Sequence, residues 1–203
     1  MLRRHRIMLV LLPSMAALVL PAPALAQTPE AKVSVAGPVT PYLPNAVNEP
    51  ALAIDANNTR VFAAGGNDLV DSAPCAGSSC DLTPDIGISG IYFSLDKGAT
   101  WTQPTYTGLT ARSGTPQIGP IHTLPWYYEN GMSSHGDPAL AFGPRPDGNG
   151  SFSWANGSRL YYANLAFPIA GRAPFTGASA AAVSRTDNVA AAAAGDKAPG
   201  WTR

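Results

Sequence analysis

The sequence predicts an all-β fold built from repeated units of short strands. Short apolar runs are separated by turn-forming residues, and almost no stretch has the apolar spacing of a helix. The chain contains 20 Gly and 20 Pro residues, a composition typical of β proteins with many turns. One segment also recurs, because residues 137–142 (Asp-Pro-Ala-Leu-Ala-Phe) repeat residues 49–54 (Glu-Pro-Ala-Leu-Ala-Ile). These three observations indicate an all-β fold with an internal repeat.

The first repeat is expected to contain three strands that end in a tight hairpin turn. Residues 50–56 alternate as a strand, residues 60–65 form the next one, and residues 90–93 lead into the turn. A polar loop with both cysteines lies between the second and third of these strands. After Tyr106 a long Gly-, Pro- and Ser-rich segment separates this repeat from the second.

The second repeat follows the same order with one interruption. The expected matches, second repeat to first, are 160–163 with 61–64, 182–187 with 91–96, and Trp201-Thr202 with Trp101-Thr102. An Ala-rich insertion at residues 190–194 separates the last two matches, and it is long enough for one helical turn before Gly195 and Pro199.

The hairpin turn of the first repeat has the most specific pattern in the chain, Ser94-Leu95-Asp96-Lys97-Gly98-Ala99-Thr100-Trp101. Asp96 can accept hydrogen bonds from backbone N–H groups of its own turn, and Gly98 supplies the positive φ that the reversal needs. Trp101 then opens the return strand and can bury its ring against the neighbouring sheet. Ser94, Asp96, Gly98 and Trp101 are therefore expected to have structural roles.

The N-terminus has the three parts of a secretory signal peptide. Arg3, Arg4 and Arg6 lie in a basic start, residues 7–20 are mostly apolar, and Ala24-Leu25-Ala26 forms a small-x-small cleavage site. The apolar run is shorter than the roughly 20 residues of a spanning helix. We therefore expect cleavage after residue 26, no membrane anchor in the mature chain, and a secreted or periplasmic location.

Charge and cysteine content agree with export. The chain has 13 Lys and Arg against 13 Asp and Glu residues, which argues against nucleic-acid binding through a basic patch. Cys75 and Cys80 are the only cysteines, and in an oxidising compartment they are expected to close a small disulfide ring. Metal binding by this pair is the alternative, but two thiolates without nearby His or Cys residues make an incomplete site. No cofactor and no metal site are expected.

The turn pattern Ser-x-Asp-x-Gly-x-Thr-Trp is that of an Asp box, or BNR repeat. With the repeated Pro-Ala-Leu-Ala segments, it makes residues 48–203 resemble the N-terminal part of a secreted BNR-repeat protein of the sialidase-like superfamily. The resemblance implies a β-propeller, which in family sialidases has six blades. A propeller needs at least four blades to close its ring. This chain has residues for about two, so we expect an incomplete ring and a fragment or truncated product.

The predicted organisation is a signal peptide (1–26), a Pro-rich lead-in (27–48), a first blade with the Asp box and a long loop (49–136), and a second, truncated blade with a degenerate Asp box (137–203).

The resemblance also implies where catalytic residues would lie. Family sialidases use an arginine triad, a Tyr/Glu nucleophile pair and an Asp acid/base that precedes the first Asp box. Asn48 stands at the position of the first arginine, and an amide cannot hold a carboxylate as a guanidinium does. Asp81 and Asp85 fall in the acid/base region, with a solvated loop carboxylate as the alternative for each. No residue matches the nucleophile pair.

Two further clusters are candidates for binding. Trp126, Tyr127 and Tyr128 are a possible stacking platform for a glycan, the alternative being that they pack against the sheets. His135 and Asp137 have a spacing seen in metal sites but lack further ligands nearby.

The resulting hypothesis is an exported propeller protein that binds a glycan or an extracellular protein and is catalytically incomplete. The alternative is the N-terminal part of an exo-α-sialidase-like glycoside hydrolase.

Overall fold

The structure is a computed structural model that describes residues 30–35, 47–74 and 82–202, and residues 31–203 form one unit. The described part is mostly β-sheet, so the all-β prediction is confirmed. Its sheets form neither a closed barrel nor a closed ring. The elements are β1 (Val47–Ile54), β2 (Phe62–Asp68), β3 (Ser89–Ser94), β4 (Tyr106–Thr110), β5 (Gln117–Ile121), the 3₁₀ turn η1 (Tyr128–Asn130), β6 (Met132–Ser134), β7 (Ala139–Pro146), β8 (Phe152–Pro168), β9 (Ala180–Thr186), α1 (Val189–Ala193) and α2 (Lys197–Gly200).

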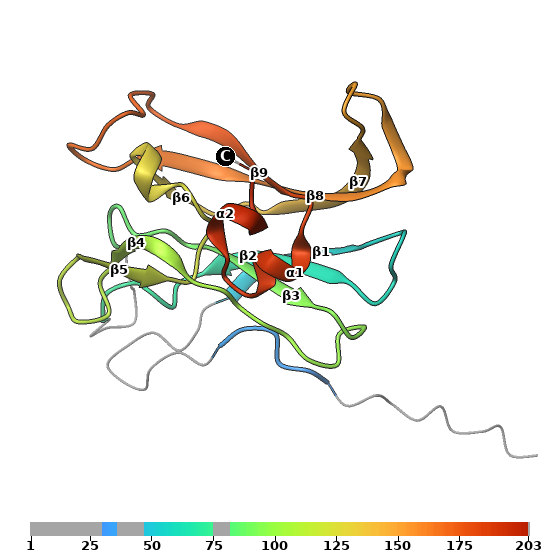
Figure 1. Ribbon diagram of the computed structural model, residues 1–203. Helices are drawn as coiled ribbons and strands as arrows, with labels where there is room; N and C mark the ends of the chain where they lie inside the picture. Colours follow the sequence, from blue (N-terminus) through green and yellow to red (C-terminus); the bar gives the residue numbers. More distant parts are fainter. Residues whose placement is uncertain (1–29, 36–46, 75–81, 203) are drawn as a thin grey trace, which may run out of the picture. The chain divides into compact units, whose positions relative to one another are not determined.

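Two antiparallel sheets contain the repeats (Figure 1). The first sheet has the order β1-β2-β3, and β4 pairs with β5 in a separate hairpin. In the second sheet β6 and β7 pair with β8, and β9 also pairs with β8. β6 lies before the predicted boundary at residue 137 but pairs with a strand of the second repeat, so the second sheet begins earlier than the sequence indicated.

Strand pairing shows that the two sheets are structural repeats, β1-β2-β3 corresponding to β7-β8-β9. Leu52 pairs with Ala64 in the first sheet, and Leu140 pairs with Tyr162 in the second. The predicted alignment of the later strands was wrong by one residue. Residues 160–163 correspond to 62–65, because Phe142 pairs with Leu160 just as Ile54 pairs with Phe62.

The backbone repeats as well, at the residue before each Pro-Ala-Leu-Ala segment. Glu49 has φ 51° and Asp137 has φ 54°, a left-handed conformation that non-glycine residues rarely adopt. The Asn67 side chain connects the two sites, since its amide donates to Glu49 Oε2 (3.0 Å) and its Oδ1 accepts from Asp137 N (3.0 Å). Both acidic residues therefore shape the start of their repeat.

The core lies between the two sheets, and each sheet has a front face and a back face. The front face of the first sheet presents Ala63, Gly65, Ile91 and Phe93 to the second sheet. The back face of the second sheet presents Leu140, Phe142, Leu160 and Tyr162 to the first. Ala63, Ile91, Leu160 and Tyr162 are fully buried, so this front-to-back contact holds the fold together.

Gly65 sets how closely the sheets approach. A Cβ at Gly65 would lie 2.7 Å from Leu140 Cδ1 and 2.8 Å from Tyr162 Cε2, which is closer than packed carbon atoms allow. Tyr162 lies over this glycine, and its hydroxyl donates to Gly90 O (2.9 Å). The interface thus combines a large ring with a position that has no side chain.

The degenerate Asp box of the second repeat keeps part of the turn chemistry and replaces the rest with helices. Thr186 Oγ1 accepts from Asn188 N (2.9 Å), as Ser94 Oγ accepts from Asp96 N (3.4 Å). Asn188 therefore occupies the place of Asp96, and the prediction that Asp187 does so was wrong by one residue. Asn188 Oδ1 then caps α1 by accepting from Ala191 N (3.1 Å).

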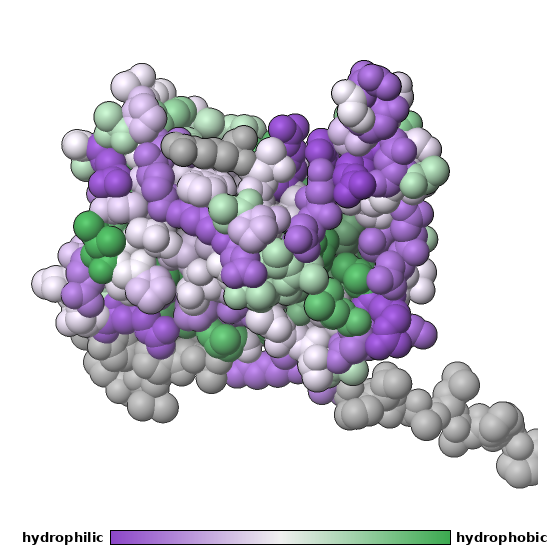
Figure 2. Space-filling view, viewed as in Figure 1, coloured by the Kyte–Doolittle hydropathy of each residue, from purple (hydrophilic) through white to green (hydrophobic). Residues whose placement is uncertain are grey.

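The insertion covers the edge of the core. α1 begins one residue before the predicted helical segment, and its surface residues are apolar where it lies over the edge of both sheets (Figure 2). Trp201 after α2 is only 3% exposed, and its Nε1 donates to Tyr106 Oη (2.7 Å). Thr202 N donates to Arg185 O (3.0 Å), as Thr102 N donates to Phe93 O (2.8 Å), so the predicted match of Trp201-Thr202 with Trp101-Thr102 is confirmed.

Candidate functional site

The two ends of the sheets differ in the length of their connections. One end has tight turns: β1 to β2, the Asp box, and β7 to β8 (right in Figure 1). The other end has the long connections from β2 to β3, from β5 to β6 and from β8 to β9. Binding residues are found disproportionately on long loops held by a rigid scaffold. The long-loop end is therefore where a functional site is sought.

The Asp box at the opposite end is a self-contained turn. Asp96 accepts hydrogen bonds from Thr100 N (2.9 Å) and from Thr100 Oγ1 (2.6 Å), while Ser94 Oγ accepts from Gly98 N (2.8 Å). Gly98 has φ 85° and Trp101 Nε1 donates to Gly98 O (3.0 Å). The hydrogen bonds from Thr100 and Ser94 lower the pKa of Asp96 to about 2. The side chains of Ser94, Asp96 and Trp101 thus form their hydrogen bonds within the turn.

The predicted acid/base candidates lie at the long-loop end. Asp81 and the Cys75–Cys80 pair fall outside the described residues. Asp85 has φ 65° and its Oδ1 accepts from Ala170 N (3.3 Å), which connects the β2–β3 loop to the β8–β9 loop. The cavity beside Asp85 measures about 10 Å³, about the space of one water molecule, so this cavity does not hold a sugar ring.

Two of the three predicted stacking aromatics have no free ring face. Tyr127 is 5% exposed, and its hydroxyl donates to Asn164 Oδ1 (2.5 Å) inside the core. Tyr128 is 8% exposed, and the Arg172 guanidinium carbon lies 3.6 Å from its ring centroid. Arg172 Nε also donates to Tyr128 O (2.6 Å). For these two residues the structure has the packed arrangement that the sequence left open as the alternative.

Trp126 differs from both neighbours, because it is half-buried and lines a cleft. The cleft measures about 160 Å³ and lies between the η1 segment and the edge strand β9. Its lining residues are Pro125, Trp126, Tyr127, Asn130, Met132, Ala182, Val183, Ser184 and Thr202. Trp126 has φ 71°, and Asn130 Nδ2 donates to its carbonyl oxygen (2.8 Å). The turn therefore holds the indole on the wall of the cleft.

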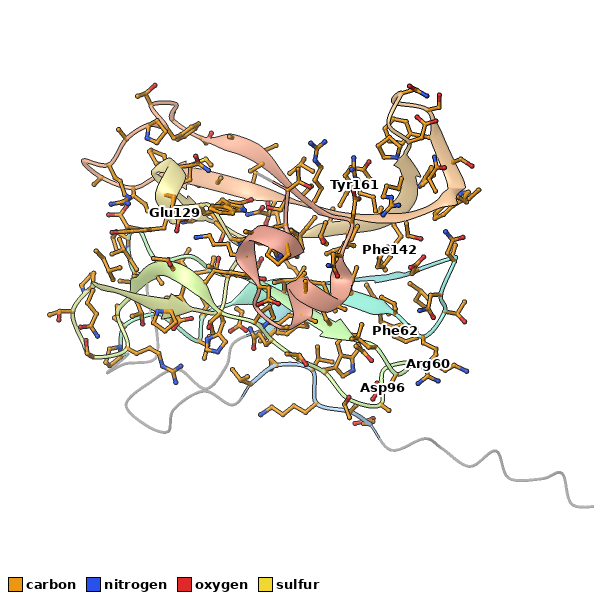
Figure 3. The ribbon with its side chains drawn as sticks, in the orientation of Figure 1. Arg60, Phe62, Asp96, Glu129, Phe142 and Tyr161 are labelled. Atoms are coloured by element: carbon orange, nitrogen blue, oxygen red, sulfur yellow. The ribbon has the colours of Figure 1, made fainter. Side chains whose placement is uncertain are left out.

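A charged pair lies beside this indole. Lys197 Nζ is 4.5 Å from the Trp126 ring centroid and forms an ion pair with Glu129 Oε1. Glu129 belongs to η1 and is labelled at the long-loop end in Figure 3. Lys197 comes from α2, which lies in the insertion of the degenerate Asp box. The cleft is thus built from the aromatic segment and the end of the second repeat.

Two carboxylates that the sequence analysis did not single out are buried near the same loops. Asp71 is 2% exposed, and its Oδ2 accepts from His122 N (2.7 Å) and lies 3.1 Å from His122 Nδ1. Asp68 is 1% exposed and accepts from Tyr92 Oη (2.8 Å) and Gln103 Nε2 (2.7 Å). Burial and the Asp68 charge raise the pKa of Tyr92. In the sequence these two Asp residues flank the apolar pair Leu69-Val70, and that pair is the only signal that indicated their burial.

The remaining candidates have structural surroundings. Asn48 is exposed on β1 and pairs with Asn67 across to β2. The His135 ring packs on Phe167 with centroids 4.4 Å apart. Within the described ranges, no group of three or more His, Cys, Asp or Glu residues is placed to hold a metal ion.

Comparisons with known proteins add no assignment. A scan of protein-family models, a search of curated proteins and a search of solved structures each found no match to this chain. In the part of the chain that the structure describes, none of the helices has the length and apolar character needed to span a membrane. The geometry of the site therefore carries the functional argument.

Proposed function

We propose that this chain is an exported, non-catalytic glycan-binding protein of the sialidase-like propeller type, in which the Trp126 cleft receives one sugar ring. The observation that carries this proposal is the half-buried indole on the wall of a small cleft lined by both apolar and polar side chains. The cleft is smaller than the roughly 300 Å³ of typical drug-sized sites, a size that suits a single ring.

The chemistry of the cleft matches the two sides of a sugar. The C–H face of a pyranose packs on aromatic rings, and the Trp126 side chain forms part of the cleft wall. Sugar hydroxyls need both donors and acceptors, which the amide of Asn130 and the hydroxyls of Ser184 and Thr202 supply. Lys197 lies beside the indole but forms an ion pair with Glu129, so the two side chains together add no net charge next to the cleft.

The carboxylates of the long-loop end support binding without hydrolysis. Most glycosidases place two carboxyl groups on either side of the scissile bond, roughly 5–9.5 Å apart. Asp68 and Asp71 are buried and accept hydrogen bonds from neighbouring side chains. Glu129 forms an ion pair with Lys197, and the cavity beside Asp85 is too small for a sugar. Among the described residues, no carboxylate pair faces the cleft.

Binding is tested by titrating the purified chain with sialyllactose and with lactose in a calorimeter. We expect both glycans to bind, and Trp126→Ala to weaken binding roughly fivefold, since an aromatic contact contributes about 1 kcal/mol. Trp154→Ala is the matched control, because Trp154 is 42% exposed on β8 and is absent from the cleft. Equal binding by Trp126→Ala and the unmodified chain would exclude this cleft.

A hydrolase remains the second candidate because of the backbone at Asp85. A non-glycine residue in the left-handed region stores strain, and such strain is found at active sites. Release of a fluorogenic aglycone from a sialic acid conjugate measures this activity. We expect no turnover, and turnover that Asp85→Asn abolishes would replace the binding proposal with catalysis.

A further inference from the structure

We infer that copies of this chain associate head to tail, with the front face of the second sheet of one copy packed on the back face of the first sheet of the next. The two sheets are structural repeats, and within one chain the front of the first already packs on the back of the second. Such a contact uses two different surfaces, so it leaves one unused surface of each kind. The unused surfaces are the front of the second sheet and the part of the back of the first that β1 forms, since Tyr92 on the β3 part of that back face is only 2% exposed.

Positions that correspond in the two repeats show which surfaces are unused. Leu140 and Phe142 on the back of the second sheet pack against the core, whereas Leu52 and Ile54, at the same repeat positions, are 59% and 48% exposed. On the front faces the difference is reversed. Ile91 of the first sheet is fully buried, and Val183, its counterpart in the second sheet, is 61% exposed.

The two unused faces differ from the buried pair in the sizes of their side chains. Inside the chain the large Tyr162 on a back face meets Gly65 on a front face. In the unused pair the back face has Ala64 where Tyr162 stands, and the front face has Ala163 where Gly65 stands, so both side chains at this position are small. The large side chain of the unused front face is Tyr161, at the position of Ala63. Tyr161 is labelled in Figure 3, where it points away from the first sheet, while Phe142 points toward it.

The back of the first sheet has a groove for this side chain. A mostly apolar groove of about 320 Å³ lies on it, with Val47, Leu52, Ala64 and Trp101 in its lining. Residues 33 and 34 line one side of this groove, so a docking sheet would enter beside them.

The correspondence between the repeats also predicts one specific pair between copies. Within the chain the rings of Phe93 and Trp201 lie 6.2 Å apart across the interface. The corresponding residues of the unused faces are Arg185 and Trp101, which form a cation–π pair between copies.

Sedimentation of the purified chain over a wide concentration range tests this inference. We expect species larger than a dimer, because each copy has two different docking faces. Val183→Asp removes the front face and Leu52→Asp removes the back face, and each variant alone should be monomeric. Ile118→Asp is the control, since Ile118 is 64% exposed on β5 and lies on neither face.

Mixing the two variants gives the decisive result. Each variant keeps the face that the other has lost, so an equimolar mixture should form a one-to-one dimer and nothing larger. A mixture that stays monomeric overturns the inference, as does a monomeric unmodified chain or a Val183→Asp variant that still associates by itself. Ile54→Asp and Tyr161→Asp form a second pair for the same mixture if either first variant does not fold.

Discussion

The two repeats have nearly the same strand pairing but bury opposite faces. In the first sheet the front face is buried and Leu52 on the back face is 59% exposed. In the second sheet Leu140, at the position of Leu52, packs on the core, and Val183 on the front face is 61% exposed. An apolar residue at a repeat position therefore does not determine its own burial, because burial depends on which neighbour covers that face.

The two Asp boxes also differ in the burial of corresponding residues. The first is a short turn at the surface, and Trp101 packs on Phe62 with ring centroids 6.3 Å apart while staying partly exposed. The second contains two helices, and its Trp201 enters the core between the sheets. The Trp of the second box is therefore a core residue where that of the first is a turn residue, and α2 also places Lys197 beside the Trp126 ring.

The largest expected effect is the loss of stability when Trp201 is replaced, compared with the replacement of Trp101. Trp201→Ala should lower the free energy of unfolding by about 3–5 kcal/mol, because it empties a buried site and leaves the Tyr106 hydroxyl without this donor. Trp101→Ala should cost clearly less, since its ring is partly exposed. Urea unfolding followed by circular dichroism measures both variants. Equal losses would contradict the difference between the two boxes.

A smaller effect is expected at the closest approach of the sheets. Gly65→Val should lower the free energy of unfolding by about 1–3 kcal/mol, because the new side chain overlaps Leu140 and Tyr162. Ala163→Val is the matched control at the corresponding position of the second sheet, where the side chain points away from the core. The two melting temperatures should differ, with that of Ala163→Val close to the unmodified chain. A tolerated Gly65→Val would show that the sheets can move apart.

The smallest expected effect is the pH dependence of the first turn. The pKa of Asp96 in the folded chain is about 2, below its ordinary value of 3.8. The stabilisation by its carboxylate is therefore complete above the ordinary value and is lost as the pH falls toward 2. Asp96→Asn should make the melting temperature less dependent on pH over this range. Asn188→Ala, at the neutral counterpart in the second repeat, should lower the melting temperature by the same amount at every pH.

The sequence predicted the parts of this protein that depend on local chemistry. Alternating apolar residues and turn-forming residues indicated an all-β fold, and the repeated Pro-Ala-Leu-Ala segment located both repeats to within one residue. The Asp box was readable because Asp96 and Gly98 satisfy groups only a few residues away. The assignments to a propeller, to export and to the sialidase-like family also came from the sequence, and they stay predictions.

Tertiary structure decided what depends on contacts between distant segments. Tyr127 and Tyr128 are buried while Trp126 is half-buried, although the three are consecutive, because the Tyr127 hydroxyl bonds to Asn164 in the core and Arg172 packs on the Tyr128 ring. Front-to-back packing of the sheets decided that Leu140 is covered while Leu52, at the same repeat position, is exposed. A single sequence specifies the apolar face of each strand, but only the position of the neighbouring sheet determines whether water or another side chain contacts that face.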